Sequence, residues 1–145
     1  SELGGSPDLV DFMGVNFYYN NQWIHETHEF LPWADVPPHP FWKNLSELIS
    51  DVYNRYGKPI IITETGHPGE DRAKWFDMVH SETAKILEMG IPLKACCLYP
   101  VIDRPDWDFP ENWHHSGIWD IHDGHILQRR PYEQLIEKIK ILTQP

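Results

Sequence analysis

Positive charge is scarce in this sequence. Its 145 residues carry 12 Lys and Arg against 22 Asp and Glu, which gives a net charge of −10. The basic residues form no cluster, and affinity for a nucleic-acid backbone comes from clustered basic side chains. The composition therefore argues against a nucleic-acid partner.

Long apolar runs are also missing. No segment approaches the roughly 18–20 apolar residues that span a bilayer. The first residues lack the basic and then apolar pattern of a signal peptide. We therefore expect a soluble, cytoplasmic protein with no membrane partner.

Cysteine is limited to the adjacent pair Cys96 and Cys97. Neighbouring residues of a strand point to opposite faces, so the pair suggests neither a disulfide nor a metal site, and we expect two small core residues. Four histidines do not have the spacing of a zinc site; they are His114, His115, His122 and His125. The sequence thus predicts no metal and no cofactor.

Aromatic residues, in contrast, are abundant: seven Trp, six Tyr and six Phe. Flat apolar side chains of this kind grip sugar rings. They also fill ordinary cores, so composition leaves both roles open. The length fits one domain, residues 1–145.

Strand and helix patterns alternate along the chain. Residues 60–63, Ile-Ile-Ile-Thr, are typical of a buried parallel strand. The predicted elements, in order, are a strand over 9–18, a long loop over 19–40, a helix over 41–56, a strand over 60–63, a helix over 70–89, a strand over 92–99, an aromatic and acidic loop, and a last helix starting at Pro131. This order predicts an α/β fold with parallel strands.

Polar residues stand where these strands end. Asn16 and Tyr18 close the first strand on one face, Glu64 follows the second, and Tyr99 ends the third. In parallel α/β folds, ligands bind at the carboxyl ends of the strands. Glu64 is therefore a candidate for a site, with a loop or capping role as the alternative.

Three segments resemble family-1-type glycoside hydrolases, a family of (β/α)8 barrels with two catalytic glutamates. Residues 11–18 resemble its sixth strand, residues 59–66 resemble its seventh strand with the nucleophile motif, and residues 116–120 resemble the stretch after its eighth strand. Residues 97–100 and 103–107 depart from the family's Trp-Ser-Leu and Asn-Phe-Glu-Trp-like pattern. The resemblance implies the C-terminal portion of a TIM (β/α)8 barrel, about strands 6 to 8 with their helices.

The resemblance also implies roles. Glu64 would be the nucleophile and Tyr18 its hydrogen-bond donor, within about 6 Å of it. Asn16 would support a sugar hydroxyl or the hydrogen-bond network of the site. The acid/base glutamate, which follows an Asn at the end of strand four in the family, would precede Ser1.

The remaining candidates for substrate binding stand in the loops. His67 is expected to contact a sugar hydroxyl or to pack within its loop. Tyr99, Trp107, Trp113 and Trp119 are candidates for a sugar-stacking wall, although some of them would only pack the core. Asp103, Arg104 and Asp106 could bind hydroxyls, and Arg104 could instead pair with a neighbouring Asp.

Two functions follow. The first is a retaining β-glycosidase that acts on a carbohydrate substrate, with this chain inactive alone. The alternative is a non-catalytic carbohydrate-binding or interaction module. Because an open sheet leaves unpaired edges and an uncovered inner face, we also expect an oligomer or a companion chain that carries the first strands. Val15, Ile61, Cys96 and Leu98 are expected on that inner face.

Overall fold

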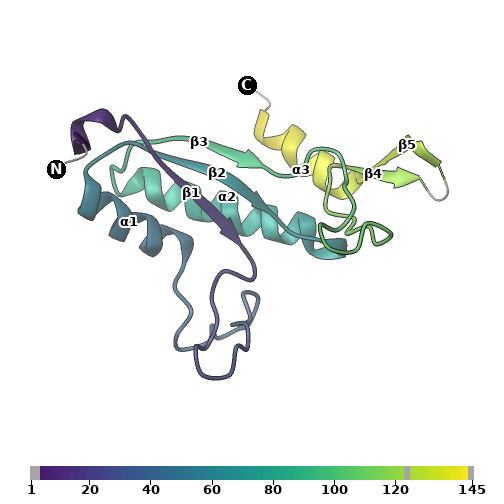
Figure 1. Cartoon of the computed structure of the whole chain (residues 1–145), viewed down its shortest axis with the longest axis horizontal. Coiled ribbons are helices and arrows are strands. Elements are labelled where there is room, and N and C mark those ends of the chain that lie inside the picture. The colour runs from purple at the N-terminus through teal and green to yellow at the C-terminus, as the bar shows by residue number, and fades with distance from the viewer. Residues whose placement is uncertain (1–3, 123–124, 144–145) are drawn as a thin grey trace.

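The computed structural model describes residues 4–122 and 125–143. A three-stranded sheet lies at its centre, and Figure 1 shows helices below and beside it. Its strands are β1 (Met13–Tyr18), β2 (Ile60–Gly66) and β3 (Leu93–Leu98), in the order β1-β2-β3 with both pairs parallel. The helices are α1 (Leu45–Tyr56), α2 (Arg72–Glu88) and α3 (Glu133–Thr143). The predicted alternation of parallel strands and helices is confirmed, and no closed barrel is present among the described residues.

The helix and strand bounds follow local chemistry. The segment before Met13 contains a 3-10 helix, Pro7–Leu9, so β1 is shorter than predicted. The helix predicted from residue 41 begins at Leu45 because the Glu47 carboxylate accepts the Asn44 backbone N–H at 2.8 Å, as in a capping box. It ends at Gly57, whose φ of 62° provides the left-handed stop.

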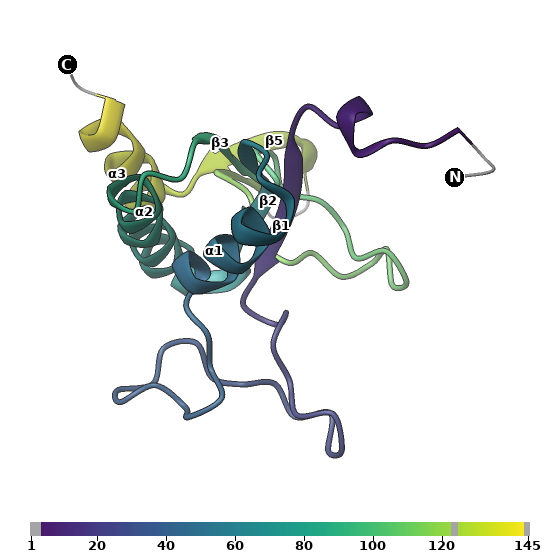
Figure 2. The ribbon, with the colours of Figure 1, turned by 90° about the vertical axis from the view of Figure 1, so that its left-hand side faces the viewer.

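The core lies between the sheet and its helices. All three helices lie on one side of the sheet in Figure 2. Ile60 and Ile62 of β2 are fully buried against a cluster that includes Leu45 and Ile49 of α1. Phe17 stacks on Trp75 of α2 with ring centroids 5.3 Å apart. This packing leaves the opposite face of the sheet uncovered by any described element.

The open face corrects the predicted positions of several apolar residues. Ile61 pairs with Gly14 and Ala95, between the buried Ile60 and Ile62, and therefore points to the open face as expected. Val15 instead packs against the core on the helix side. Cys96 and Leu98 line a cavity of about 230 Å³ together with α2 and α3 residues.

The two cysteines are also exposed, contrary to their expected core role. β3 is the outer strand of the described sheet, and α2 and α3 cover it only in part. Adjacent positions do point in opposite directions, because Cys96 pairs with Ile62 of the helix side. The apolar run over residues 92–99 does not indicate how little of this strand is packed against α2 and α3.

A β-bulge interrupts β2 near its carboxyl end. Val15 pairs with Ile62 and Asn16 pairs with Glu64, so Thr63 is the extra residue. Thr63 donates its hydroxyl to Asn16 Oδ1 at 2.6 Å on the open face. Thr65 points to the helix side and accepts the Trp75 indole N–H at 2.9 Å. Both Thr63 and Glu64 can therefore face away from the helices.

A hairpin that the sequence patterns did not predict precedes the last helix. Strands β4 (Trp119–His122) and β5 (His125–Pro131) pair antiparallel. Pro131 ends β5, so α3 begins at Glu133 and not at the proline. Within the described residues, no helix is both long enough and apolar enough to cross a bilayer.

Candidate active site

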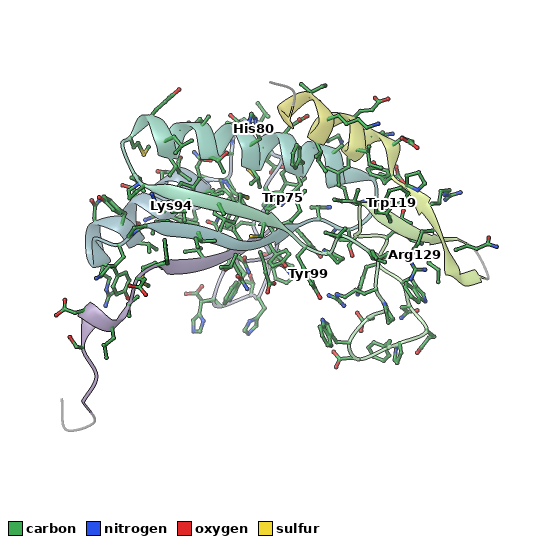
Figure 3. All side chains as sticks on the ribbon, turned by 90° about the horizontal axis from the view of Figure 1, so that it is seen from above. Trp75, His80, Lys94, Tyr99, Trp119 and Arg129 are labelled. Carbon is green, nitrogen blue, oxygen red and sulfur yellow. The ribbon has the colours of Figure 1, made fainter. Side chains whose placement is uncertain are left out.

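A pocket of about 670 Å³ opens where the three parallel strands end. This volume is within the usual range for small-molecule sites. The pocket collects predicted site residues from all three strand ends and the loops behind them: Tyr18, Glu64, His67, Tyr99, Arg104 and Trp107. Figure 3 shows Tyr99 at this end of the sheet.

Glu64 and Tyr18 are directly linked in the pocket. The Tyr18 hydroxyl donates a hydrogen bond to Glu64 Oε2 at 2.9 Å, which confirms the predicted proximity. Among the described residues, no group donates a hydrogen bond to Glu64 Oε1. One carboxylate oxygen is therefore held while the other stays open to a ligand.

The electrostatics keep Tyr18 in its donor form. Burial raises the pKa of Tyr18, and the hydrogen bond to Glu64 and the negative charge of that carboxylate raise it further. The phenol is therefore protonated at neutral pH. It can only stabilise Glu64 as a hydrogen-bond donor.

Gly66 lets the third strand approach this pair. A Cβ atom at Gly66 would overlap the Tyr99 carbonyl oxygen. The Tyr99 backbone N–H also donates to the Thr65 carbonyl at 2.9 Å. The absence of a side chain at Gly66 thus brings Tyr99 to the wall of the pocket.

His67 sits in an aromatic group at the side of the pocket. Its ring lies 4.5 Å from that of Tyr19 and 5.3 Å from that of Trp33, and its Nδ1 lies 2.6 Å from the Pro68 carbonyl oxygen. Trp33 belongs to the long loop before α1 and packs edge-on against Trp75 at 5.2 Å. The loop-packing role of His67 is therefore present, and a sugar contact stays a prediction.

Asn16 lies outside the pocket lining. Its side chain is exposed on the open face, where Oδ1 accepts the Thr63 hydroxyl. That contact places Asn16 in the hydrogen-bond network of the strand ends. A role in binding a sugar hydroxyl is untested.

The loop between β3 and β4 supplies the far wall. Asp106 accepts the backbone N–H groups of Phe109 and Asp108, and its carboxylate lies 2.6 Å from His114 Nε2. The Phe109 and Asp108 N–H groups, with His114, hold the pKa of Asp106 below its ordinary value. Both Asp106 and His114 line the pocket. The Pro105-Asp106 turn signal could have predicted this self-bonded loop.

Asp103 and Trp119 are not brought to the pocket. The Asp103 side chain is fully buried, and its Oδ1 accepts the Ser116 backbone N–H at 3.1 Å. Trp119 pairs with Pro131 in the hairpin. Figure 3 shows it at the hairpin, apart from Tyr99. Trp113 bridges to Pro105 and also lies outside the lining.

A buried ion pair anchors this wall to α2. Arg72 contacts both carboxylate oxygens of Asp120, at 2.6 and 3.0 Å, and donates to the Gly117 carbonyl at 2.8 Å. Its guanidinium lies 3.7 Å over the Tyr132 ring. A Cβ atom at Gly117 would overlap the Asp103 backbone nitrogen, so this position needs glycine. The anchor holds the loop against the start of α2.

Asp120 of this ion pair and two other residues carry metal-ligand atoms close together. Asp103, His115 and Asp120 place such atoms within 4.8 Å of one another. Arg72 already neutralises Asp120, which weakens this group as a cation site. His114 is engaged with Asp106, and the side chains of His122 and His125 lie outside the described residues. The expectation of no metal stays a prediction.

Comparison with known proteins identifies the fold. No protein-family model and no curated protein matches the sequence. A family 1 β-glucosidase from Thermotoga maritima matches 92% of this chain and 34% of its own, with a TM-score of 0.67 and 15% identity. A β-glycosidase from the hyperthermophile Thermosphaera aggregans matches 92% and 32%, with a TM-score of 0.69 and 19% identity.

A rice β-glucosidase matches 69% of this chain and 24% of its own, with a TM-score of 0.62 and 19% identity. These neighbours are TIM-barrel glycosidases, whereas the described residues form a smaller α/β unit. The chain is therefore similar in structure to the carboxyl-terminal part of family 1 β-glucosidases and spans about a third of the length of the Thermotoga enzyme.

Proposed function

We propose that this chain supplies the nucleophile half of the active site of a retaining β-glycosidase, with its strands as the sixth to eighth of a (β/α)8 barrel. The observation that carries the proposal is the hydrogen bond between Tyr18 and Glu64 at the carboxyl ends of adjacent parallel strands. Catalytic side chains of (β/α)8 enzymes stand at this end of the barrel. The fold of the β-glucosidase neighbours supports the same assignment.

In this mechanism Glu64 Oε1 attacks the anomeric carbon of the sugar while Oε2 stays bonded to Tyr18. A second carboxyl group, supplied from outside this chain and about 5–5.5 Å from that of Glu64, protonates the leaving oxygen. Water then hydrolyses the glycosyl ester on Glu64 and restores the carboxylate. Tyr99 and Trp107 offer aromatic faces to the sugar ring from the pocket wall.

The first experiment replaces the nucleophile in the full-length protein that contains this chain. We expect Glu64→Gln to lower kcat/KM on aryl β-glycosides by about 10³-fold or more, because the amide cannot attack. Glu137→Gln, an exposed carboxylate of α3, serves as the matched control. A Glu64→Gln variant with most of its turnover would remove Glu64 from this role.

A second measurement separates the enzyme from the non-catalytic module. A 2-deoxy-2-fluoroglycoside should leave a glycosyl ester on the peptide that contains Glu64, detected by mass spectrometry. A full-length protein that binds sugars but forms no ester and cleaves no glycoside would support the binding module instead.

A further inference from the structure

Arg104 is a cation without a counter-charge in a strongly acidic molecule. The chain has 22 acidic residues against 12 basic ones, yet no carboxylate of the described residues forms an ion pair with Arg104. Its Nη1 donates to the Pro105 carbonyl at 2.9 Å. Its Nε is buried and has no acceptor. A buried donor without a partner costs free energy, so an unmet acceptor is indicated.

The two aspartates nearest in sequence are engaged elsewhere. Asp106 accepts two backbone N–H groups and pairs with His114. Asp103 Oδ1 accepts from the Ser116 backbone N–H, whereas its buried Oδ2 has no hydrogen-bond partner among the described residues and lies 3.6 Å from His115 Nδ1. The alternative in which Arg104 pairs with a neighbouring Asp is therefore not found among the described residues.

Arg104 faces the same pocket as Glu64 and Tyr18. Burial and the Glu64 carboxylate raise the pKa of Tyr18, and the positive charge of Arg104 acts in the opposite direction. The guanidinium lies 5.0 Å from the centre of the Trp107 ring and 5.8 Å from that of Tyr99. Two aromatic side chains thus position the cation in the pocket wall.

One nitrogen of Arg104 remains open to a ligand. Among the described residues, Nη2 makes no hydrogen bond. Unlike Nε, it is not one of the fully buried polar atoms. It is therefore accessible. A guanidinium binds carboxylate and phosphate oxygens with short, charge-assisted hydrogen bonds.

We propose that Arg104 makes this pocket a site for anionic glycosides, in which the sugar carries a negatively charged carboxylate or phosphate. The inference rests on the proposed glycosidase function and names its substrate class. The Glu64 carboxylate repels an anion, so the charged substituent lies at the Arg104 end of the pocket while the anomeric carbon lies at Glu64. A neutral sugar would leave Arg104 without a direct anionic partner.

The test compares three substrates on the full-length protein: p-nitrophenyl β-D-glucuronide, the corresponding glucoside 6-phosphate and the neutral glucoside. We expect one anionic substrate to have a kcat/KM at least 10-fold above that of the neutral one, and the identity of that substrate distinguishes carboxylate from phosphate. Arg104→Gln should lower the anionic-to-neutral ratio by 10-fold or more, and Arg104→Lys should lower it less. Arg55→Gln removes an equal charge from the exposed end of α1 and should leave the ratio unchanged.

A binding measurement keeps this inference separate from the proposed function. Calorimetry on the Glu64→Gln protein should show D-glucuronate or glucose 6-phosphate binding at least 10-fold more tightly than D-glucose, a comparison that needs no change at Arg104. Preferential anion binding by the Glu64→Gln protein, together with no glycoside cleavage by the unmodified protein, would contradict the glycosidase function and still support the anion site. Cleavage with equal or better use of the neutral glucoside, unaffected in ratio by Arg104→Gln, would overturn the anion site alone.

Discussion

At the scale of single residues, one extra residue in β2 decides which way Glu64 points. The bulge at Thr63 shifts the register between β1 and β2, so Glu64 meets Tyr18 on the open face while Thr65 bonds Trp75 on the helix side. A regular strand would send adjacent residues Thr63 and Glu64 to opposite faces. Bulges beside active sites commonly redirect a side chain in this way.

The contribution of Tyr18 can be measured by removing only its hydroxyl. Tyr18→Phe in the full-length protein should lower kcat by about 10- to 150-fold, since a hydrogen bond to a charged group contributes about 1.5–3 kcal/mol. The steady-state rate on an aryl β-glycoside is the measurement. Tyr56→Phe, at the exposed end of α1, is the matched control and should keep its rate. A Tyr18→Phe variant as active as this control would contradict the positioning role.

At the scale of the elements, a buried carboxylate joins the first two helices. Glu82 of α2 accepts the Ser46 hydroxyl at 2.6 Å and the Ser46 backbone N–H at 2.9 Å at the start of α1. Lys85 donates to its other oxygen at 2.6 Å. Burial acts to raise the pKa of Glu82, but the hydrogen bonds from Lys85 and Ser46 outweigh it and hold the pKa below its ordinary value of 4.5.

This contact predicts a pH-dependent loss of stability. A carboxylate with a lowered pKa in the folded state stabilises the fold above its unfolded pKa, and that stabilisation is lost as pH falls through the folded value. Glu82→Gln should therefore cost about 1–3 kcal/mol of unfolding free energy at pH 7. The difference from the unmodified protein should shrink as the pH is lowered from about 5 to 3.

Urea unfolding of the full-length protein at several pH values is the measurement. Glu88→Gln, at the exposed end of the same helix, should change stability by less than about 0.5 kcal/mol. An equal deficit for Glu82→Gln at pH 7 and pH 3 would show that the ionised form of Glu82 is not what stabilises the junction.

At the scale of the whole molecule, the sheet has an uncovered face and two unpaired edges. Among the described residues, β1 and β3 each pair on one side only, and Ala95 and Cys97 are exposed on or beside the open face. Figure 2 shows the helices confined to the other side. Open edges and apolar faces promote association.

We therefore predict that the 145-residue chain produced alone associates with itself, or binds a companion that carries the missing strands. Sedimentation velocity over a range of concentrations measures this. Ala95→Glu on the open face should weaken the association, whereas Ala84→Glu on the exposed side of α2 should not. A chain that stays monomeric at high concentration would show that this sheet needs no further layer.

Local patterns were sufficient to predict the alternation of strands and helices and the position of Glu64 after a buried strand. Helical periodicity and β-branched runs are properties of neighbouring residues, which the backbone geometry converts directly into elements. The resemblance of residues 59–66 added the role of Glu64. The resemblance also implied the link between Glu64 and Tyr18, two residues whose strand ends a parallel sheet brings to one edge.

The tertiary structure alone decided which side chains share the pocket. Asp103 and Asp106 are three residues apart in one loop, yet Asp103 is buried against Ser116 and His115 while Asp106 lines the pocket. The buried pair of Arg72 and Asp120 joins residues 48 positions apart, and no local pattern encodes it. Strand register, the bulge at Thr63 and the packing of helices on β3 depend on contacts between distant segments. For this reason the sequence alone does not determine that Val15 and Cys96 point to the helix side of the sheet.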